Sequence, residues 1–251
     1  MAKSPTLYKP IIFLLMQVLS VVCLFAQNAD SLVLSAEKEY TSLETALKTP
    51  DLVYRLDLHG QHLKVFPAEV FLFKNLQELN LSHNSMAILP DSISNLVNLK
   101  ILNVSHNKLT ELLPDVGGLN NLSILNVSHN KIYTLPAQIG FLVKLSSLDV
   151  SENKLTMLPS TLGNLVALKS IIANMNEIAE LPKEIGNLQQ LAYMDLWGNN
   201  ITEFPNEIGK LSHNLKVLDM RVIAINFDKQ KRMHDLLPDT DIIFSKSCNC
   251  Q

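Results

Sequence analysis

The stretch Leu76-Gln-Glu-Leu79-Asn-Leu81-Ser-His-Asn84 decides how this chain folds, because its pattern recurs every 23 residues. Seven rows of this length begin at Val53, Leu76, Leu99, Leu122, Leu145, Leu168 and Leu191. Positions 1, 4, 6, 11, 14, 18 and 21 of each row are apolar with few exceptions. Position 9 is asparagine in six rows, at Asn84, Asn107, Asn130, Asn153, Asn176 and Asn199. Position 15 is proline in six rows, at Pro67, Pro90, Pro136, Pro159, Pro182 and Pro205. A helical bundle gives no reason for Asn and Pro to return at one phase, so the period indicates a stack of similar coils.

Elementary physics supports a stacked coil. Side chains at positions 4 and 6 alternate inward on a short strand, and the later apolar positions turn back underneath it. One coil cannot bury that face alone, whereas stacked coils bury it continuously. The asparagine at position 9 sits where the backbone leaves the strand, so its amide can satisfy N–H and C=O groups of adjacent coils.

The rows resemble the leucine-rich repeat family, L-x-x-L-x-L-x-x-N-x-L-x-x-L-P-x-x-I-x-x-L-x-x. Their length is similar to that of Ras-suppressor and Scribble-type repeats and of secreted bacterial repeat proteins of the Bacteroidota type. The resemblance implies an α/β solenoid: a curved right-handed superhelix with a parallel β-sheet on its concave face and helical caps at both ends.

Composition and charge exclude several classes of protein. The chain has 251 residues, among them 45 leucines and 23 asparagines, and 47% apolar with 18% charged residues exclude intrinsic disorder. A net charge of −3 without a long basic run gives no electrostatic basis for nucleic-acid binding. We find no nucleophile motif, phosphate loop or zinc spacing, and we therefore expect neither an enzyme nor a cofactor.

Residues 1–26 are expected to be a signal peptide. Lys3 and Lys9 precede an apolar run from Ile11 to Phe25, and the small Ala26 offers a cleavage site. Fifteen helical residues span roughly 22 Å, short of the ~30 Å hydrocarbon core, so a membrane anchor is the weaker alternative. Lipidation at Cys23 is disfavoured by the preceding Val22. We expect a secreted, periplasmic or cell-surface protein without stable membrane insertion after cleavage, and the end of the signal resembles bacterial ones.

The repeats, residues 53–214, are expected to lie between two caps. In the N-terminal cap, 27–52, Thr41-x-x-Glu44 indicates a capping box before a short helix that buries Leu43, Ala46 and Leu47. Residues 215–251 hold a partial eighth repeat, a cap and a tail. There Asp228 is expected to cap a helix carrying Met233, Leu236 and Leu237, and 241–244 to form a strand. Pro114 falls one place late in the third row, which predicts a local irregularity.

His83, His106 and His129 share position 8 of three consecutive rows. In-register stacking would place them at the ~4.8 Å strand spacing, close enough to consider a transition-metal site. The alternative is that Ser-His-Asn is filler of the family. We assign no metal ligand.

Polar residues fill position 5, at Asp57, Asn80, Asn103, Asn126, Asp149, Asp195 and Asp219, and should face the concave side as a polar ladder. Row six interrupts this column with Ile172 and also places Met175 at position 8. Row seven adds Tyr193 and the single tryptophan, Trp197, and Arg221 follows in row eight beside Val217. Exposed apolar patches with Trp, Tyr and Arg are typical of binding hot spots. We predict a partner-binding patch formed by Ile172, Met175, Tyr193, Trp197 and Arg221. Ala173 stands at a framework position of row six where a large residue is expected, which predicts a local gap in the core. The alternative is that Trp197 packs over this gap instead of facing a partner.

Together these features predict a non-enzymatic protein–protein interaction module, secreted or at the cell surface, that binds a macromolecular partner through its concave sheet. Alternatives are metal or small-ligand sequestration by the His83/His106/His129 column, or a structural envelope protein. Cys248 and Cys250 near the end leave a disulfide-linked dimer open.

Overall fold

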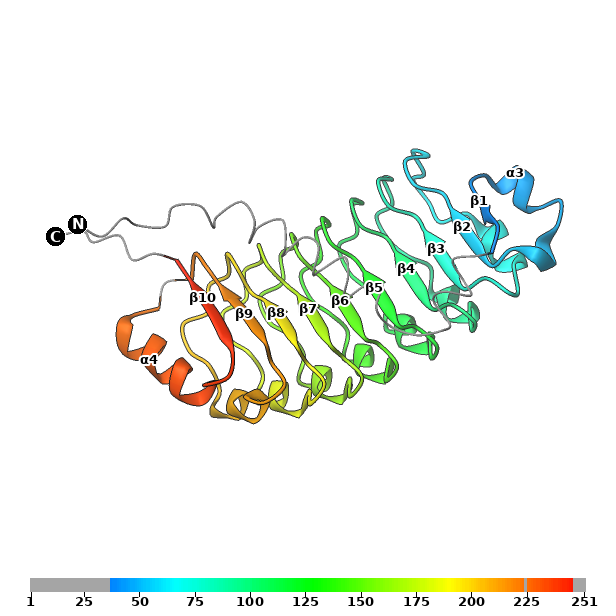
Figure 1. Cartoon of the computed structure of the whole chain (residues 1–251). Helices are drawn as coiled ribbons and strands as arrows, with labels where there is room; N and C mark the ends of the chain where they lie inside the picture. Colours follow the sequence, from blue (N-terminus) through cyan, green and yellow to red (C-terminus); the bar gives the residue numbers. More distant parts are fainter. Residues whose placement is uncertain (1–36, 224, 246–251) are drawn as a thin grey trace, which may run out of the picture. The chain divides into compact units, whose positions relative to one another are not determined.

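The chain forms one parallel sheet of ten strands within residues 37–223 and 225–245, which the computed structural model describes. Strand order follows the sequence from β1 to β10 (Figure 1). The strands are β1 Glu39–Tyr40, β2 Arg55–Asp57, β3 Glu78–Asn80, β4 Ile101–Asn103, β5 Ile124–Asn126, β6 Ser147–Asp149, β7 Ser170–Ile172, β8 Tyr193–Asp195, β9 Val217–Met220 and β10 Asp241–Phe244. Strands β2 to β8 each occupy positions 3 to 5 of a row, which confirms the predicted solenoid. The proposed signal peptide, Cys248 and Cys250 lie outside the described residues.

The core is a continuous stack of the framework positions. In the second row the side chains of Leu79 and Leu81 are fully buried, and the flanking strand residues Glu78 and Asn80 are half-buried on the other face. Register is kept from coil to coil, since Leu79 pairs with Leu56 on one side and Leu102 on the other. Each coil therefore buries its apolar face against its neighbours, as the period predicts.

The asparagines of position 9 form the predicted hydrogen-bonded ladder. Asn153 is buried, and its Nδ2 donates to the carbonyl oxygens of Val127, Val150 and Ser151 at 3.0–3.1 Å. Its Oδ1 accepts the N–H of Ile132 at 2.9 Å. One side chain thus satisfies backbone groups of its own coil and of the preceding coil, which explains the fixed phase of this residue.

The return segments carry short 3-10 helices: η1 Pro50–Leu52, η2 Ala68–Leu72, η3 Asp91–Asn95, η4 Pro114–Gly118, η5 Ala137–Phe141, η6 Ser160–Asn164, η7 Lys183–Asn187 and η8 Asn206–Leu211. The recurring proline directly precedes most of them, with φ near −70°. The prediction of a local irregularity in the third row was wrong. Pro114 becomes the first residue of η4, where its missing N–H costs nothing, and η4 covers the same positions as its neighbours.

Both caps are present, with different capping residues from those predicted. Helix α3, Leu43–Ala46, is capped by Ser42, whose side chain accepts the N–H of Thr45 at 3.3 Å, and the capping box at Thr41 was wrong. Leu47, expected on the buried face, is 40% exposed. The sequence also did not reveal β1, which extends the sheet before the first row.

Helix α4, Phe227–Leu236, packs against the last coil and is capped by Asn226, which accepts the N–H of Lys229 at 3.0 Å. Asp228, the predicted cap, lies in the first helical turn instead. Met233 and Leu237 are buried as expected, and the predicted strand is β10, paired in parallel with β9.

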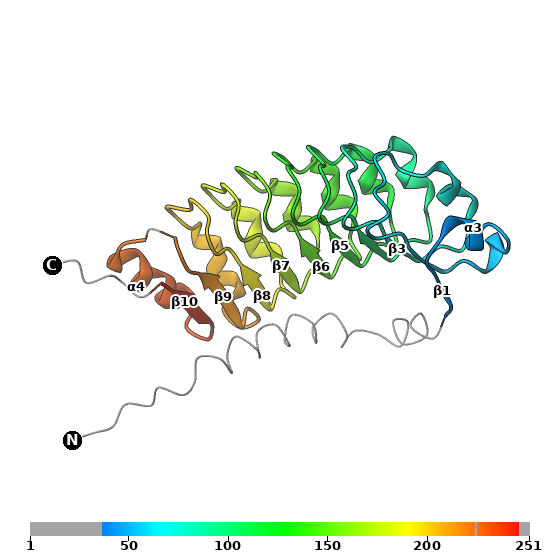
Figure 2. The same ribbon diagram turned by 90° about the horizontal axis from the view of Figure 1, so that it is seen from above.

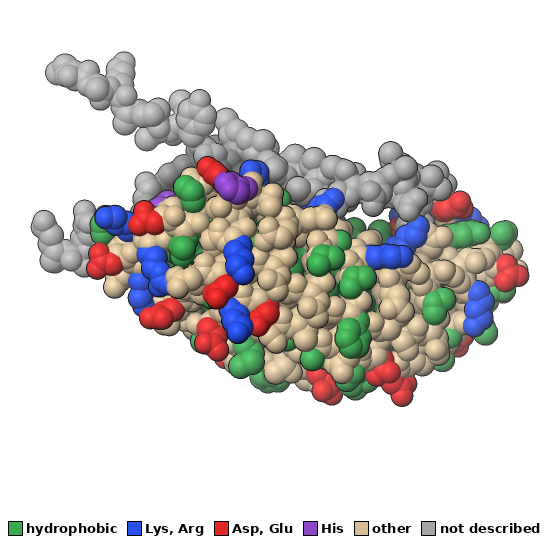
Figure 3. Space-filling model, turned by 90° about the horizontal axis from the view of Figure 1, so that it is seen from below, with side chains coloured by type: hydrophobic (Ala, Val, Ile, Leu, Met, Phe, Trp, Pro, Cys, Tyr) green, Lys and Arg blue, Asp and Glu red, His purple; other side chains and the backbone are tan. Residues whose placement is uncertain are grey.

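The stack of repeats is curved, with the strands along the inner side of the curve (Figure 2). The face carrying the 3-10 helices shows hydrophobic side chains scattered among others rather than merged into one patch (Figure 3). Among the described residues, no helix combines the length and the apolar character that crossing a membrane requires.

Candidate binding surface on the concave sheet

The polar residues of position 5 end each strand in the same way. Oδ1 of Asn80, Asn103 and Asn126 accepts the N–H of the residue two places later at 2.9–3.0 Å. Asp149, Asp195 and Asp219 do the same toward Ser151, Trp197 and Arg221 at 3.0–3.1 Å. The predicted polar ladder therefore also has a structural role, because it turns the chain out of the strand and fixes the backbone of position 7.

Position 8 adopts the left-handed conformation in all eight rows, which sequence reasoning missed. Its φ lies between 50° and 69° at Gly60, His83, His106, His129, Glu152, Met175, Gly198 and Val222. L-residues reach this region at a cost, and glycine reaches it freely. The glycines at this phase in rows one and seven were the available signal.

The histidine column exists as a stack of rings. The ring centroids of His83 and His106 lie 4.1 Å apart with planes inclined by 12°, and those of His106 and His129 lie 3.8 Å apart at 15°. Imidazole lone pairs lie in the ring plane, so face-to-face rings do not direct them at a common ion. No cluster of three or more metal-binding side chains occurs among the described residues, and the metal hypothesis gains no support.

Glu152 and the stacking of the rings themselves affect the electrostatics of the histidines. Nδ1 of His129 lies 2.9 Å from Oε2 of Glu152, the next residue of the column. Desolvation lowers the pKa of His106, since its two ring faces are covered although its edge is exposed, and the charges of His129 and His83 lower it further. Glu152 acts in the opposite direction.

The predicted partner-binding residues lie on neighbouring strands and turns in rows six to eight. Tyr193 pairs in register with Ser170 and Val217, and Ile172 stands beside Asp195. Ile172, Tyr193 and Trp197 are half-buried. Met175 is 44% exposed. A Cβ on Gly198 would lie 2.9 Å from its sulfur, so the thioether reaches the seventh row because that residue is glycine.

Arg221 joins this patch through an ion pair. Asp219, 1% exposed, accepts hydrogen bonds from Nε of Arg221 at 3.0 Å and from Nη2 at 2.7 Å. The guanidinium carbon then lies 5.7 Å from the ring centroid of Trp197, within cation–π range. The pair fixes a planar cation beside the indole, and its hydrogen bond to Asp219 raises the pKa of Arg221.

Buried and half-buried carboxylates lie next to the patch. Burial raises the pKa of Asp149 and of Asp195, although both accept hydrogen bonds that favour the ionised form. Asn174 donates to Oδ2 of Asp195 at 2.6 Å. Burial, and then the charges of Asp195 and Asp219, raise the pKa of the Tyr193 hydroxyl, which stays neutral and able to donate a hydrogen bond at physiological pH.

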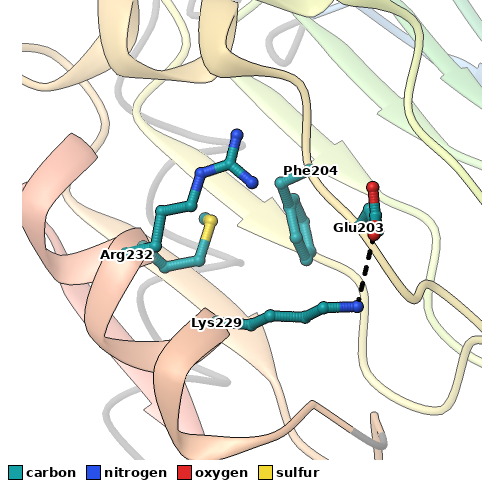
Figure 4. A pocket seen from close by; sticks show the side chains of 5 residues that line it. Glu203, Phe204, Lys229 and Arg232 are labelled. Atoms are coloured by element: carbon teal, nitrogen blue, oxygen red, sulfur yellow. Dashed lines mark hydrogen bonds and ion pairs between the residues drawn. The ribbon is translucent and has the colours of Figure 1, made fainter.

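A small pocket lies elsewhere, between α4 and the last return segment (Figure 4). Glu203, Phe204, Lys229, Arg232 and Met233 line it, and Nζ of Lys229 lies 3.5 Å from Oε1 of Glu203. Its empty volume of about 240 Å³ includes open solvent. We regard it as a packing gap at the cap.

Comparison with known proteins identifies the repeats. A model described as leucine-rich repeat region matches residues 91–176, and two described as leucine rich repeat match 51–109 and 190–211. The chain belongs to the leucine-rich repeat family. No curated protein matches this leucine-rich repeat chain.

Among solved structures, one similar to this leucine-rich repeat protein is the ectodomain of the plant membrane receptor kinase GASSHO1/SCHENGEN3 from Arabidopsis thaliana, in complex with CASPARIAN STRIP INTEGRITY FACTOR 2. The two are 27% identical, with a TM-score of 0.67 over 82% of this chain. This chain spans 26% of that ectodomain.

Proposed function

We propose that this leucine-rich repeat protein is a non-enzymatic interaction module that binds a protein partner through its concave sheet. The patch of Trp197, Tyr193, Ile172, Met175 and Arg221 anchors that partner. The observation that carries the proposal is the break in the polar columns of positions 5, 7 and 8, where an indole, a phenol and a fixed guanidinium lie together. Aromatic and arginine side chains dominate binding hot spots.

The rigidity of the surface favours recognition. Ile172 and Tyr193 stand on strands, and Asp195 and Asp219 hold the turns that carry Trp197 and Arg221, so little conformational entropy is lost there on binding. The similar plant ectodomain was solved in complex with another molecule, which supports this use of the fold. The sheet is open rather than enclosed, which suits a macromolecular partner better than a small molecule.

Photo-crosslinking tests the patch. A photoreactive phenylalanine analogue replaces Tyr193 on the concave side or, as a control, Tyr133, which is 51% exposed on a return segment. We expect one reproducible adduct from position 193 in cells of the source organism, identified by mass spectrometry. The same adduct from position 133 would refute the placement of the interface.

Substitution measures the anchor. With the crosslinked partner purified, Trp197→Ala should weaken binding by about 2 kcal/mol, roughly thirtyfold in Kd. Tyr133→Ala should leave the Kd unchanged. Equal affinities of the two variants would show that Trp197 serves packing rather than binding.

We further propose that the protein works outside the cytoplasm, as a secreted, periplasmic or cell-surface module. Residues 1–26 have the pattern of an export signal. Support also comes from the ectodomain to which the repeats are similar. Cell fractionation with N-terminal sequencing should find Gln27 as the first residue of exported protein, whereas a cytoplasmic protein retaining residues 1–26 would refute export.

A further inference from the structure

The other half of the concave face has the opposite chemistry to the aromatic patch. In rows two to four, positions 3, 5, 7 and 8 contain one carboxylate, that of Glu78, and its Oε2 already accepts from Nε of Arg55 at 2.7 Å. The remaining polar residues there are amides, hydroxyls and imidazoles. Rows five to eight instead contain Asp149, Glu152, Asp195 and Asp219 at these positions, and Asp195 and Asp219 are buried.

Rows two to four present unused hydrogen-bond donors. Nδ2 of Asn80, Asn103 and Asn126 donates to no described residue, because only Oδ1 of each takes part in the turn. The ring nitrogens of His83 and His106 likewise have no hydrogen bond or ion pair within the described part of the chain. Two exposed lysines, Lys108 and Lys131, follow the second and third histidines by two residues.

The column already receives one carboxylate. Glu152 closes the histidine stack on its C-terminal side, with Oε2 at 2.9 Å from Nδ1 of His129. Both side chains remain accessible, 36% exposed for His129 and 47% for Glu152. This contact shows that a carboxylate can approach the stack at its nitrogen-bearing edge, the part that His83 and His106 leave free.

We propose that the His83–His106–His129 stack binds the carboxylates of an acidic polypeptide segment, and that acidification strengthens this binding. This inference rests on the proposed function, because it takes the concave side as the face that meets a protein partner. Among residues 37–223 and 225–245, the acidic groups that act on the stack are Glu152 and Asp149, both from row five. A segment with carboxylates over rows two to four and apolar side chains over rows six to eight would complement both halves of the face.

The pH dependence follows from linkage. Protonation of His106 is disfavoured where it stands, because a ring covers each of its faces, with centroids 4.1 and 3.8 Å away, and charges on those rings oppose its own. A bound carboxylate favours the protonated rings, so binding takes up protons. For each proton taken up on binding, the affinity for the carboxylate rises by up to about tenfold for every unit by which the pH falls.

The test uses the full chain and a fluorescent oligoglutamate peptide, followed by anisotropy near pH 7.5 and near pH 5.5. We expect binding at least about tenfold tighter at the lower pH, from uptake of one or more protons. The triple variant His83→Asn/His106→Asn/His129→Asn should lose most of this gain. Asparagine is the suitable replacement because it tolerates the left-handed backbone of these positions.

A matched control removes the same number of titrating groups elsewhere. The variant His59→Asn/His62→Asn/His213→Asn replaces three histidines outside the stack and should keep the pH response. Equal loss in both triple variants would reduce the effect to net charge and overturn the proposal. The proposal would also be overturned if the peptide did not bind the parent chain near pH 5.5. Displacement of the peptide by acetate at equal carboxylate concentration would overturn it as well.

Glu152→Gln provides a gain that misfolding cannot mimic. It frees Nδ1 of His129 from its internal carboxylate, so the peptide should bind severalfold tighter at either pH. Weaker or unchanged binding contradicts the proposed edge. The peptide assay does not depend on Trp197, so a normal pH response in Trp197→Ala, together with failed partner crosslinking, would refute the proposed function alone.

Discussion

Two adjacent asparagines near the C-terminal end allow a sharp test of the ladder. Asn199 is 4% exposed, and its Nδ2 donates to the carbonyl oxygens of Ala173 and Leu196 at 2.9 and 2.8 Å. Its Oδ1 accepts the N–H of Ile178 at 3.0 Å. Asn200, the next residue, is exposed and its side chain makes no hydrogen bond to a described residue. Asn199→Ala and Asn200→Ala therefore remove the same amide at neighbouring positions, one buried and hydrogen-bonded and the other exposed.

The expected magnitude comes from the backbone groups left without partners. The carbonyl of Ala173 keeps a second donor, Nδ2 of Asn176, whereas the N–H of Ile178 and the carbonyl of Leu196 lose their partners. An unsatisfied buried group costs about 1–3 kcal/mol, which for two groups gives roughly 2–6 kcal/mol, with about 3 kcal/mol expected after partial hydration. Asn200→Ala should change the free energy of unfolding by less than about 0.5 kcal/mol.

Urea unfolding followed by circular dichroism measures both variants against the parent chain. A loss of about 3 kcal/mol should also lower the thermal midpoint by roughly 6–12 °C in a domain of this size. A loss below about 1 kcal/mol in Asn199→Ala, or similar losses in the two variants, would refute the reasoning. The recurrence of asparagine would then need another cause than buried hydrogen bonding.

Three further substitutions test other features of the coil. Val222→Asn should raise stability by about 1 kcal/mol, because a β-branched residue is strained at its φ of 57°; an unchanged thermal midpoint would contradict this. Asp149→Asn should stabilise the chain at neutral pH but not near pH 3, since the raised pKa of this carboxyl means that stability falls as pH rises above 3.8; equal urea midpoints at neutral pH would be inconsistent. Gly140→Ala should cost about 1–3 kcal/mol in urea unfolding, because its Cβ would lie 2.5 Å from the Thr161 carbonyl oxygen, and a neutral result would show that the return segments yield easily.

The sequence predicts the framework well because the framework is over-determined. Each row must bury the same phases and satisfy the same backbone groups, so the strands, the asparagine ladder and the stacking follow from the period alone. The caps are predicted less well. Thr41 and Ser42, like Asn226 and Asp228, are all good capping residues, and only the path of the chain decides which oxygen reaches the free N–H. Likewise, Pro114 fits either the cap or the first helical position.

The binding face is harder to predict, because its chemistry depends on a backbone feature that most rows do not signal. Position 8 is left-handed in every row, yet six of the eight residues there are not glycine. That conformation orients the imidazoles into a stack and brings Met175 over Gly198. The ion pair between Asp219 and Arg221 likewise follows from the turn that ends the strand, where the same carboxylate also holds the Arg221 N–H. One uniform backbone therefore presents donors in rows two to four and an aromatic, carboxylate-lined patch in rows six to eight. A partner that binds both halves must extend along the sheet, with its carboxylates over rows two to four and its apolar side chains over rows six to eight.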